Sequence, residues 1–473
     1  MNRPTLPPHA RIHCLGIGGF GINPLARVMH DLGYIVSGCD MQDSPLIPPL
    51  RELGLAVAIG HDPSHLDRFS PDALVISSAV RPDNPEVLAA VARGIPVYKR
   101  ADVLGALMAD RIGIAIAGTH GKTTTTAMMA HVLSACGHDP TFIIGGVARD
   151  LGTNARAGQG PFFVIEADEY DRMFMGLRPR IIILTSLEMD HPDMFAGIEE
   201  VRALFSEFVD LLPEDGLLVG CYDQPEVRAL LHRRWDQGRP AISYGLEMAA
   251  EWNAQAVEPN EQGGMDFLVS LRQPDGEGGF LIGGMPVSLR LAGEHNVQNA
   301  LAVLAVADAL GVALRQAAAA LGTFSGTGRR FEVKGEVRGV TVIDDYAHHP
   351  TAIRMTLAAA RARYGQRPIW AVWQPHTYSR TRALLDEFGA CFGNADHVII
   401  TDIYRSRDRE TFGVSVEDVL ARMPDHPDAR HIGPLDEVTD YLAGHVQAGD
   451  IVIVMSAGDA TRIGDDLLKR LGG

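Results

Sequence analysis

The sequence predicts an α/β protein of three domains: a Rossmann-like N-terminal domain, a central P-loop ATPase-type domain with a mixed sheet, and a Rossmann-like C-terminal domain. Length is one reason, because 473 residues exceed a single core at about 150 residues per domain. The others are the alternation of short apolar runs with helical stretches, and a glycine-rich turn after two of these runs. The expected domains cover residues 1–110, 111–322 and 323–473.

Each expected domain contains apolar runs of strand length. In the first domain a helical stretch over residues 23–32 separates the runs at 11–15 and 34–38, and this βαβ order predicts parallel strands. Residues 250–292 are rich in Gly, Gln and Glu, and we expect antiparallel strands and loops there. Residues 322–328 are an expected linker. The further expected strands are 73–77, 95–98, 112–117, 162–166, 181–185, 216–219, 340–344, 369–373, 397–400 and 451–455.

Composition and charge restrict the function. With 46% hydrophobic and 21% charged residues, the sequence is typical of a globular protein. The net charge of −17 argues against nucleic acid as a partner, since nucleic-acid binding depends on basic surfaces. Residues 1–10 lack the apolar core of a signal peptide, and no apolar run reaches the length of a membrane span. The five cysteines are scattered without a CxxC pair, so we expect a cytoplasmic protein with neither disulfides nor a zinc site.

The most informative turn is Gly118-Thr119-His120-Gly121-Lys122-Thr123-Thr124, which follows the apolar run 112–117 and opens a helix. Such a turn directs backbone N–H groups and a helix N-terminus at an anion, while lysine adds charge for a phosphate and a threonine hydroxyl suits Mg²⁺. The common nucleotide-binding loop has four residues between its glycines, whereas two lie between Gly118 and Gly121. The spacing therefore indicates a narrower class of ATP-binding proteins.

A second glycine turn lies near the N-terminus. Gly16-Ile17-Gly18-Gly19-Phe20-Gly21 follows the run 11–15, and Asp40 ends the next expected strand, which matches the fingerprint of dinucleotide-binding domains. The pattern indicates a diphosphate held at a helix N-terminus, and both a nicotinamide cofactor and a UDP-sugar have one. From these residues alone, an NAD-linked oxidoreductase and a UDP-sugar-binding protein both stay open.

Polar residues gather where the expected central strands end. Glu166-Ala167-Asp168-Glu169-Tyr170-Asp171 follows one strand, and Glu188-Met189-Asp190-His191 follows the next. In open α/β sheets ligands bind at the carboxyl ends of the strands, and Mg²⁺ prefers oxygen ligands. Beside Lys122 and Thr123, these segments predict a site for a magnesium-bound nucleotide.

Further polar segments lie beyond residue 290. Gly328-Arg329-Arg330-Phe331-Glu332 places two guanidinium groups near a domain junction, where they can reach a transferred phosphoryl group. Arginines after another strand suit a carboxylate, which they bind with two parallel hydrogen bonds. The segments that supply amides, imidazoles and these arginines are Gly293–Asn299, Asp344–Thr351 and Gln374–Arg382.

In this order the segments resemble the Mur ligase family, ATP-dependent amide ligases that build the peptide stem of bacterial cell-wall precursors. The resemblance runs from about residue 11 to 460. It implies ATP and Mg²⁺ as cofactors, and activation of a carboxylate as an acyl phosphate. The segments that carry it are Gly118–Thr124, Glu166–Asp171, Asp190-His191, Gly293–Asn299, Arg329-Arg330-Phe331 and Asp344–Thr351.

The resemblance also implies a role for each matching residue. The expected catalytic residues are Lys122, His191, Arg330, His348 and His376. The expected ATP-binding residues are Gly118, Thr119, His120, Gly121, Lys122, Thr123, Thr124, His295, Asn296, Asn299, Arg330 and Asp345. The expected UDP-sugar-binding residues are Gly16, Gly18, Gly19, Gly21, Asp40 and Ser78. The expected amino-acid-binding residues are Tyr346, His348, His376 and Arg380, and the expected metal ligands are Thr123, Glu166 and His191.

Two segments indicate the substrate within the family. Ile12–Gly19 and Gln374–Thr381 resemble most the member that joins L-alanine to the lactyl carboxylate of UDP-N-acetylmuramate. A recycling member that attaches a tripeptide to the same UDP-sugar is the alternative, and Tyr170 favours it. The sequence does not decide whether the amine is L-alanine, glycine, serine or a peptide. Three histidines are candidates for the base that deprotonates it. We expect a monomer or homodimer without membrane insertion.

Two positions depart from the family pattern. Thr185-Ser186 stands where the family usually has Thr-Asn, and Thr377 stands where many alanine-adding members have a second arginine. Recognition of the amino-acid carboxylate is therefore expected to depend on Arg380. Since no lysine occurs between residues 199 and 216, we do not expect the modified lysine that bridges two metals in some members.

Overall fold

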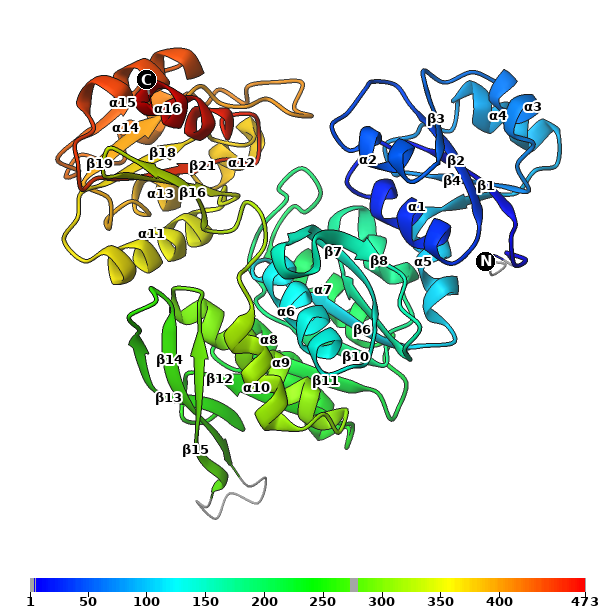
Figure 1. The fold of residues 1–473 in the computed structure, drawn as a ribbon, viewed down its shortest axis with the longest axis horizontal. Coiled ribbons are helices and arrows are strands. Elements are labelled where there is room, and N and C mark those ends of the chain that lie inside the picture. Colours follow the sequence, from blue (N-terminus) through cyan, green and yellow to red (C-terminus); the bar gives the residue numbers. More distant parts are fainter. Residues whose placement is uncertain (1–3, 5, 273–279, 473) are drawn as a thin grey trace.

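The computed structural model describes residues 4, 6–272 and 280–472 and contains three α/β domains, each with its own sheet. The N-terminal domain, in blue, and the C-terminal domain, in yellow to red, both adjoin the central domain, in cyan to green (Figure 1). The predicted fold class is confirmed. The expectations for residues 1–10 and 250–292 lie partly outside the described residues.

The N-terminal domain is a parallel sheet of five strands in the order β3-β2-β1-β4-β5. Four of its strands match predicted runs, whereas β3 was not predicted, because none of its four residues is fully buried and its alternation is weak. The strands are β1 (Arg11–Leu15), β2 (Ile35–Asp40), β3 (Ala56–Ile59), β4 (Ala73–Ile76) and β5 (Val97–Lys99). The helices are α1 (Ile22–Asp31), α2 (Ile47–Glu52), α3 (Ser64–Phe69), α4 (Pro85–Ala92) and α5 (Arg100–Met108).

The central domain contains a mixed sheet of ten strands in the order β15-β14-β13-β12-β11-β10-β6-β9-β7-β8. The strands β13, β14 and β15 pair antiparallel, as predicted for residues 250–292, and project away from the N-terminal domain (Figure 1). The strands are β6 (Ile112–Ala117), β7 (Thr141–Ala148), β8 (Thr153–Arg156), β9 (Phe162–Glu166), β10 (Ile181–Leu184), β11 (Leu217–Cys221), β12 (Ala241–Gly245), β13 (Trp252–Pro259), β14 (Met265–Arg272) and β15 (Phe280–Leu289).

The helices of the central domain cover both faces of this sheet. Ten of the 14 residues of α6 are buried, since it packs against both α9 and the sheet. A helix buried on nearly all sides needs small or apolar residues throughout, which the alanine-rich α9 supplies. The helical elements are α6 (Lys122–Ala135), η1 (Arg149–Leu151), η2 (Tyr170–Gly176), α7 (Ile198–Val209), α8 (Pro225–Asp236), α9 (Glu294–Ala309) and α10 (Leu314–Thr323).

The C-terminal domain has a six-stranded sheet in the order β16-β17-β21-β18-β19-β20, in which the edge strand β16 runs antiparallel to β17 and the other pairs are parallel. The strands are β16 (Glu332–Val337), β17 (Val340–Asp345), β18 (Ile369–Trp373), β19 (His397–Ile400), β20 (Ala429–His431) and β21 (Ile451–Met455). The helices are α11 (Pro350–Tyr364), α12 (Tyr378–Ala383), α13 (Leu385–Gly389), α14 (Val416–Leu420), α15 (Leu435–His445) and α16 (Arg462–Gly472).

Sheet order brings the polar segments of the sequence together. In the central sheet β6 lies between β9 and β10, so the three segments that follow these strands meet at one edge. In the C-terminal sheet β21 lies between β17 and β18, so the polar segments after those two strands end at one edge as well. This is the edge at which parallel α/β sheets bind ligands.

Two properties of the chain bear on its surroundings. Among the described residues, no helix combines the length and apolar character that crossing a membrane requires. All five cysteines are free thiols, four of them buried.

Candidate active site

The central glycine loop joins β6 to α6, and its shape requires both glycines. Gly118 and Gly121 have positive φ angles of 133° and 79°, which side chains strain. A Cβ at Gly118 would also collide with Thr185 and come within 2.7 Å of the Ser186 backbone. Ser186 in turn orders the loop, because its carbonyl accepts the Thr119 N–H at 2.9 Å and its Oγ accepts the His120 N–H at 2.9 Å.

The lysine of this loop is held by a carboxylate. Lys122 Nζ donates to both Glu169 carboxylate oxygens, at 3.0 and 2.9 Å, and to the Gly118 carbonyl. Burial alone would lower the pKa of Lys122, but the adjacent Glu169 and Asp168 carboxylates outweigh it and raise this pKa. Lys122 is therefore a cation at neutral pH, and a phosphate at the loop would compete with Glu169 for it.

Two of the three predicted metal ligands lie together. Thr123 Oγ1 donates to Glu166 Oε1 at 3.0 Å, and Glu166 Oε2 accepts the Gly145 N–H at 2.6 Å. The third ligand, His191, lies instead 3.8 Å from Glu169 and 3.7 Å from Asp190. Within the described chain no hydrogen bond or ion pair joins His191 to Glu166. The oxygen pair of Thr123 and Glu166 suits a hard divalent cation.

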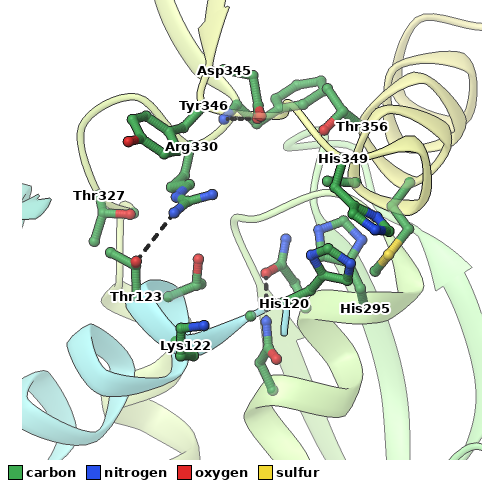
Figure 2. A pocket seen from close by; sticks show the side chains of 18 of the residues that line it. His120, Lys122, Thr123, His295, Thr327, Arg330, Asp345, Tyr346, His349 and Thr356 are labelled. Atoms are coloured by element: carbon green, nitrogen blue, oxygen red, sulfur yellow. Dashed lines mark hydrogen bonds between the residues drawn. The ribbon is translucent and has the colours of Figure 1, made fainter. Parts of the chain in front are cut away.

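A cavity of about 620 Å³ lies between the central and C-terminal domains. Figure 2 shows Lys122, Thr123 and His295 of the central domain on one side and Arg330, Asp345 and Tyr346 on the other. The predicted residues that line the cavity are Thr119, His120, Gly121, Lys122, Thr123, Thr124, Glu166, His191, His295, Asn296, Asn299, Arg330, Asp345, Tyr346, His348, His376 and Arg380.

An arginine of the C-terminal domain reaches the glycine loop. Arg330 Nη2 donates to Thr123 Oγ1 at 3.2 Å across the cavity (Figure 2). The segment around Arg330 is fixed by Asp345, whose carboxylate accepts the Phe331 and Ala347 N–H groups at 2.7 Å each. A cationic group thus stands at the hydroxyl that opens α6, in a position to contact a terminal phosphate.

Three predicted ATP-binding residues, His295, Asn296 and Asn299, lie in the first turns of α9. Asn296 donates to the Ala292 carbonyl at 2.7 Å and accepts from Asn299 at 3.2 Å, so both amides are held in place. A Cβ at Gly121 would lie 2.8 Å from Asn299 Oδ1, which shows how closely α9 packs on the loop. Burial lowers the pKa of His295 to about 4, so this imidazole is neutral at pH 7.

The predicted amino-acid-side residues surround a buried ion pair. Arg380 is 3% exposed, and its Nε and Nη2 lie 2.8 Å from Asp190 Oδ1 in the central domain. Burial is the main cause and the charge of Arg380 the second cause of two lowered pKa values. The pKa of His348 lies well below its usual range, and that of His376 is about 4. The two imidazole rings lie 5.9 Å apart and are neutral at pH 7, so either one is able to accept a proton.

Thr377 does not do the work of the second arginine that many alanine-adding members have at this position. Its Oγ1 lies 2.8 Å from Ser379 Oγ, and the residue is 3% exposed. Arg380 is joined to Asp190, whereas Arg407 lines the cavity with 41% of its side chain exposed and pairs with Asp193 at 2.7 Å. Arg407 was missed at the sequence level, since it lies in a loop outside every recognised segment.

The N-terminal glycine loop is organised by the end of β2. The Gly16 and Ile17 N–H groups donate to the Cys39 carbonyl at 2.9 and 3.2 Å, and Gly18 N–H donates to Asp40 Oδ2 at 2.9 Å. Asp40 therefore fixes the loop itself. Ser78 is exposed in the turn after β4.

Arg100 is a second residue that the sequence did not single out. A Cβ at Gly21 would collide with its guanidinium, so the arginine lies against the start of α1. No motif surrounds it in the sequence, and only the packing of α5 beside α1 brings it to the loop. The predicted residues of this loop do not line the cavity of 620 Å³, so the two glycine loops belong to separate sites.

The sequence matches three descriptions of one family in order. The Mur ligase family, catalytic domain, matches residues 11–112; the Mur ligase middle domain matches residues 116–307; and the Mur ligase, glutamate ligase domain, matches residues 329–458. The chain belongs to the Mur ligase family, whose members are ATP-dependent ligases.

Relatives that share one name match almost the full length of the chain. UDP-N-acetylmuramate–L-alanine ligase of Geotalea daltonii is 42% identical over 98% of both chains, and that of Geobacter sulfurreducens is 42% identical over 98% of this chain and 97% of its own. The crystal structure of UDP-N-acetylmuramate–alanine ligase from Thermotoga maritima matches with a TM-score of 0.80 at 27% identity, over 98% of this chain and 99% of that one. A murein peptide ligase from Psychrobacter arcticus matches over the same shares with a TM-score of 0.70 at 28% identity.

Proposed function

We propose that the protein joins L-alanine to the lactyl carboxylate of UDP-N-acetylmuramate at the expense of ATP. The observation that carries the proposal is the 42% identity to L-alanine ligases over 98% of the chain. The higher TM-score to an L-alanine ligase than to a murein peptide ligase favours the amino acid over a tripeptide as the amine.

In the first step a lactyl carboxylate oxygen attacks the γ-phosphorus of ATP, and ADP leaves. The product is an acyl phosphate, which provides the leaving group that a free carboxylate lacks. Lys122 lies on the phosphate loop and Arg330 reaches it from the C-terminal domain, and their charges offset the negative charge of the transferred group. Thr123 and Glu166 supply the oxygen ligands we propose for Mg²⁺, which offsets phosphate charge when bound.

In the second step the amine of L-alanine attacks the acyl carbon, an amide bond forms and phosphate leaves. The amine loses a proton, which needs a base that is neutral at pH 7. His348 and His376 fit, because burial lowers the pKa of both. His191 also lines the cavity, with its pKa lowered by burial. The neighbouring Arg407 supplies an accessible cation for the carboxylate of the amino acid.

We propose that the N-terminal loop binds the UDP moiety, with Asp40 ordering the glycines and Arg100 beside Gly21. The proposed domain limits are residues 1–110, 111–322 and 323–473, which the three sheets and the three family matches support. We place the reaction in the cytoplasm, where ATP is made, and propose a monomer or homodimer.

The test is ADP release by the purified protein with ATP, Mg²⁺, UDP-N-acetylmuramate and one amine at a time. We expect release with L-alanine that requires the UDP-sugar, and slower release with glycine or serine. Mass spectrometry should find the L-alanyl product. Preference for the tripeptide would support the recycling alternative, and no release with any amine would overturn the ligase assignment for this chain.

A further inference from the structure

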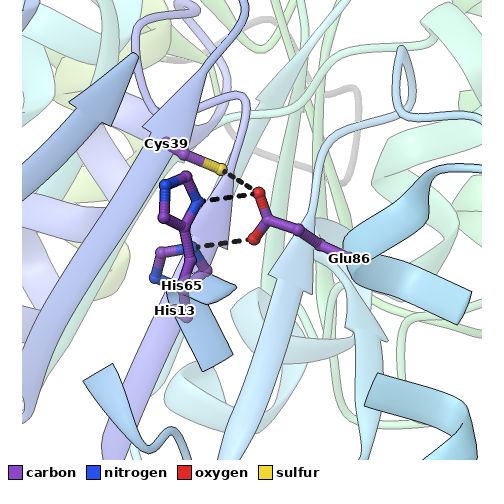
Figure 3. A group of neighbouring side chains, drawn as sticks. All are labelled: His13, Cys39, His65 and Glu86. Carbon is purple, nitrogen blue, oxygen red and sulfur yellow. Dashed lines mark hydrogen bonds and ion pairs between the residues drawn. The ribbon is translucent and has the colours of Figure 1, made fainter. Parts of the chain in front are cut away.

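A group of four metal-binding side chains lies in the N-terminal domain, apart from the proposed active site. His13 comes from β1, Cys39 from β2, His65 from α3 and Glu86 from α4 (Figure 3). Their exposed fractions are at most 8%, and their donor atoms all lie within 4.8 Å of one another. None of them lines the cavity between the other two domains.

The distances within this group are slightly shorter than the edges of a metal coordination shell. Glu86 Oε1 lies 3.2 Å from Cys39 Sγ and 3.0 Å from His65 Nδ1, and Glu86 Oε2 lies 3.2 Å from His13 Nε2. Around a tetrahedral zinc ion with bonds of about 2.0–2.3 Å, neighbouring ligand atoms are about 3.3–3.5 Å apart. A small movement outward would make room for the ion.

One contact in the group is poorly explained by hydrogen bonding. His13 Nε2 and Glu86 Oε2 are both buried and lie 3.2 Å apart, yet neither has a hydrogen-bond partner of acceptable geometry. Buried polar atoms in native proteins are almost always hydrogen-bonded. Two ligands that point at a shared cation, instead of at each other, would produce this arrangement.

The surroundings of His13 suit a metal ligand. Its other ring nitrogen, Nδ1, lies 2.9 Å from Ser37 Oγ, which itself contacts the Ile12 carbonyl at 3.5 Å. Metal-bound histidines almost always donate their second N–H to such a partner, which fixes the tautomer that leaves the ligating nitrogen free. The Ser37 hydroxyl thus supports coordination through Nε2.

We infer that His13, Cys39, His65 and Glu86 form a structural zinc site. Two imidazoles, a thiolate and a carboxylate are ligands that Zn²⁺ accepts in tetrahedral sites. Two neutral imidazoles, one thiolate and one carboxylate balance the charge of Zn²⁺, which suits the apolar core formed by Leu15, Leu66, Leu74, Val87 and Ala90. Binding forms the Zn–S bond and releases the thiol proton of Cys39 to solvent, with no change of oxidation state.

The site would hold together the parts of the domain that position the first glycine loop. The backbone carbonyl of Cys39 accepts the N–H groups of Gly16 and Ile17. Glu86 also accepts a hydrogen bond of 2.9 Å from the N–H of Asp62, which lies just before α3 in the sequence. The ion would therefore link β1, β2, α3 and α4 directly beneath the loop. This inference does not depend on the proposed function.

The test measures zinc in the full-length protein, freed of any affinity tag and dialysed against EDTA before titration with Zn²⁺. We expect one tightly bound zinc per chain in the wild type, and at least about 100-fold weaker binding in Cys39→Ser and in His65→Gln. Cys14→Ser is the matched control, because Cys14 is equally buried on the neighbouring strand but outside the group. It should bind zinc like the wild type.

Cobalt gives a spectroscopic readout of the thiolate. The Co²⁺-loaded wild type and Cys14→Ser should show a thiolate-to-cobalt charge-transfer band, and Cys39→Ser should not. Zinc should also raise the Tm of the wild type and leave that of Cys39→Ser unchanged. Absence of stoichiometric zinc in the wild type would overturn the inference without any variant. Equal zinc affinity of Cys39→Ser and the wild type would overturn it too, since the metal would then lie elsewhere, for example at Thr123 and Glu166.

Discussion

The two glycine loops of this protein share a backbone design and differ in the side chains placed around it. Each follows a buried parallel strand, β1 or β6, and leads into a helix. The first loop is tied to its own domain by Asp40 and the Cys39 carbonyl. The second carries Lys122 and Thr123 at the start of α6 and is met by Arg330 from another domain. On the function proposed above, the same turn serves binding of the UDP-sugar in one place and phosphoryl transfer in the other.

The difference predicts which measurement each loop controls. A phosphate that is only held needs backbone N–H groups and a helix N-terminus. A phosphate that is transferred also needs cations where charge develops in the transition state. Changes at the second loop should thus lower turnover, and changes at the first should lower affinity for the UDP-sugar.

The largest effect is expected for Lys122→Ala. Loss of the cation at the transferred phosphate should lower kcat by about 10³-fold. The dissociation constant for UDP-N-acetylmuramate, measured by calorimetry, should stay within about twofold of the wild type, because Lys122 lies on the other loop. A large loss of UDP-sugar affinity in this variant would contradict the division between the loops.

Arg330→Ala should lower kcat by about 10²-fold, since one of two opposed cations is removed. The adjacent Arg329 is the control, because it points into its own domain and pairs with Asp344 at 3.2 Å and the Ser456 carbonyl at 2.6 Å. Arg329→Ala should lower Tm more than kcat. If both variants lost the same share of kcat, the contact of Arg330 with Thr123 would have no special part in turnover.

At the first loop, Asp40→Ala should weaken UDP-sugar binding about tenfold. The variant loses the charge-assisted hydrogen bond to the Gly18 N–H, a contact of about 1.5 kcal/mol. The KM for ATP should not change. Asp43→Ala is the matched control, since Asp43 is exposed nearby and accepts only the Ser44 N–H beside it. Equal losses in both variants would indicate a general charge effect instead of loop ordering.

The contrast also marks how far the sequence could predict the structure. Both loops and the strands before them were predicted, because glycines after an apolar run are a local pattern. The edge strand β3 was missed, since four residues of which none is fully buried leave little periodicity. The pairing of Arg380 with Asp190 joins residues 190 positions apart on two domains, and no local pattern contains it.

The group around Glu86 shows the same limit more sharply. The cysteines have no metal-binding spacing, and for that reason no zinc site was predicted from the sequence. Its four members lie on two strands and two helices, and only the fold brings them together. Each of these residues alone predicts no metal site, and only the fold places their side chains close enough together to form one.

The smallest effect concerns the pH dependence of stability, which should differ between the surroundings of the two loops. Near the second loop, burial lowers the pKa of His295 to about 4. The unfolded chain protonates this histidine near pH 6.5 and the folded chain only near pH 4. Its contribution to the free energy of unfolding is therefore lost as the pH falls from about 6.5 to 4.

Beneath the first loop, the stability contribution of the buried group is lost in a lower pH range. Burial would raise the pKa of Glu86, but the adjacent His13 imidazole and the hydrogen bond from Cys39 outweigh it and lower this pKa to about 2. Glu86 thus keeps its full contribution above about pH 4.5 and loses it as the pH falls towards 2. Between pH 6.5 and 4.5 the Glu86 carboxylate stays ionised in the folded chain, so its own titration changes stability little there.

Tm measured from pH 6.5 to 4.5, with EDTA present so that metal binding does not enter, separates the two. His295→Gln should flatten the fall in Tm by a few degrees, because glutamine takes up no proton in either state. Glu86→Gln should lower Tm at every pH in this window, because the Glu86 carboxylate is ionised throughout it in the folded chain. A slope that His295→Gln leaves unchanged would contradict this expectation, and the buried histidine beside the second loop would then not be a group that limits stability in mild acid.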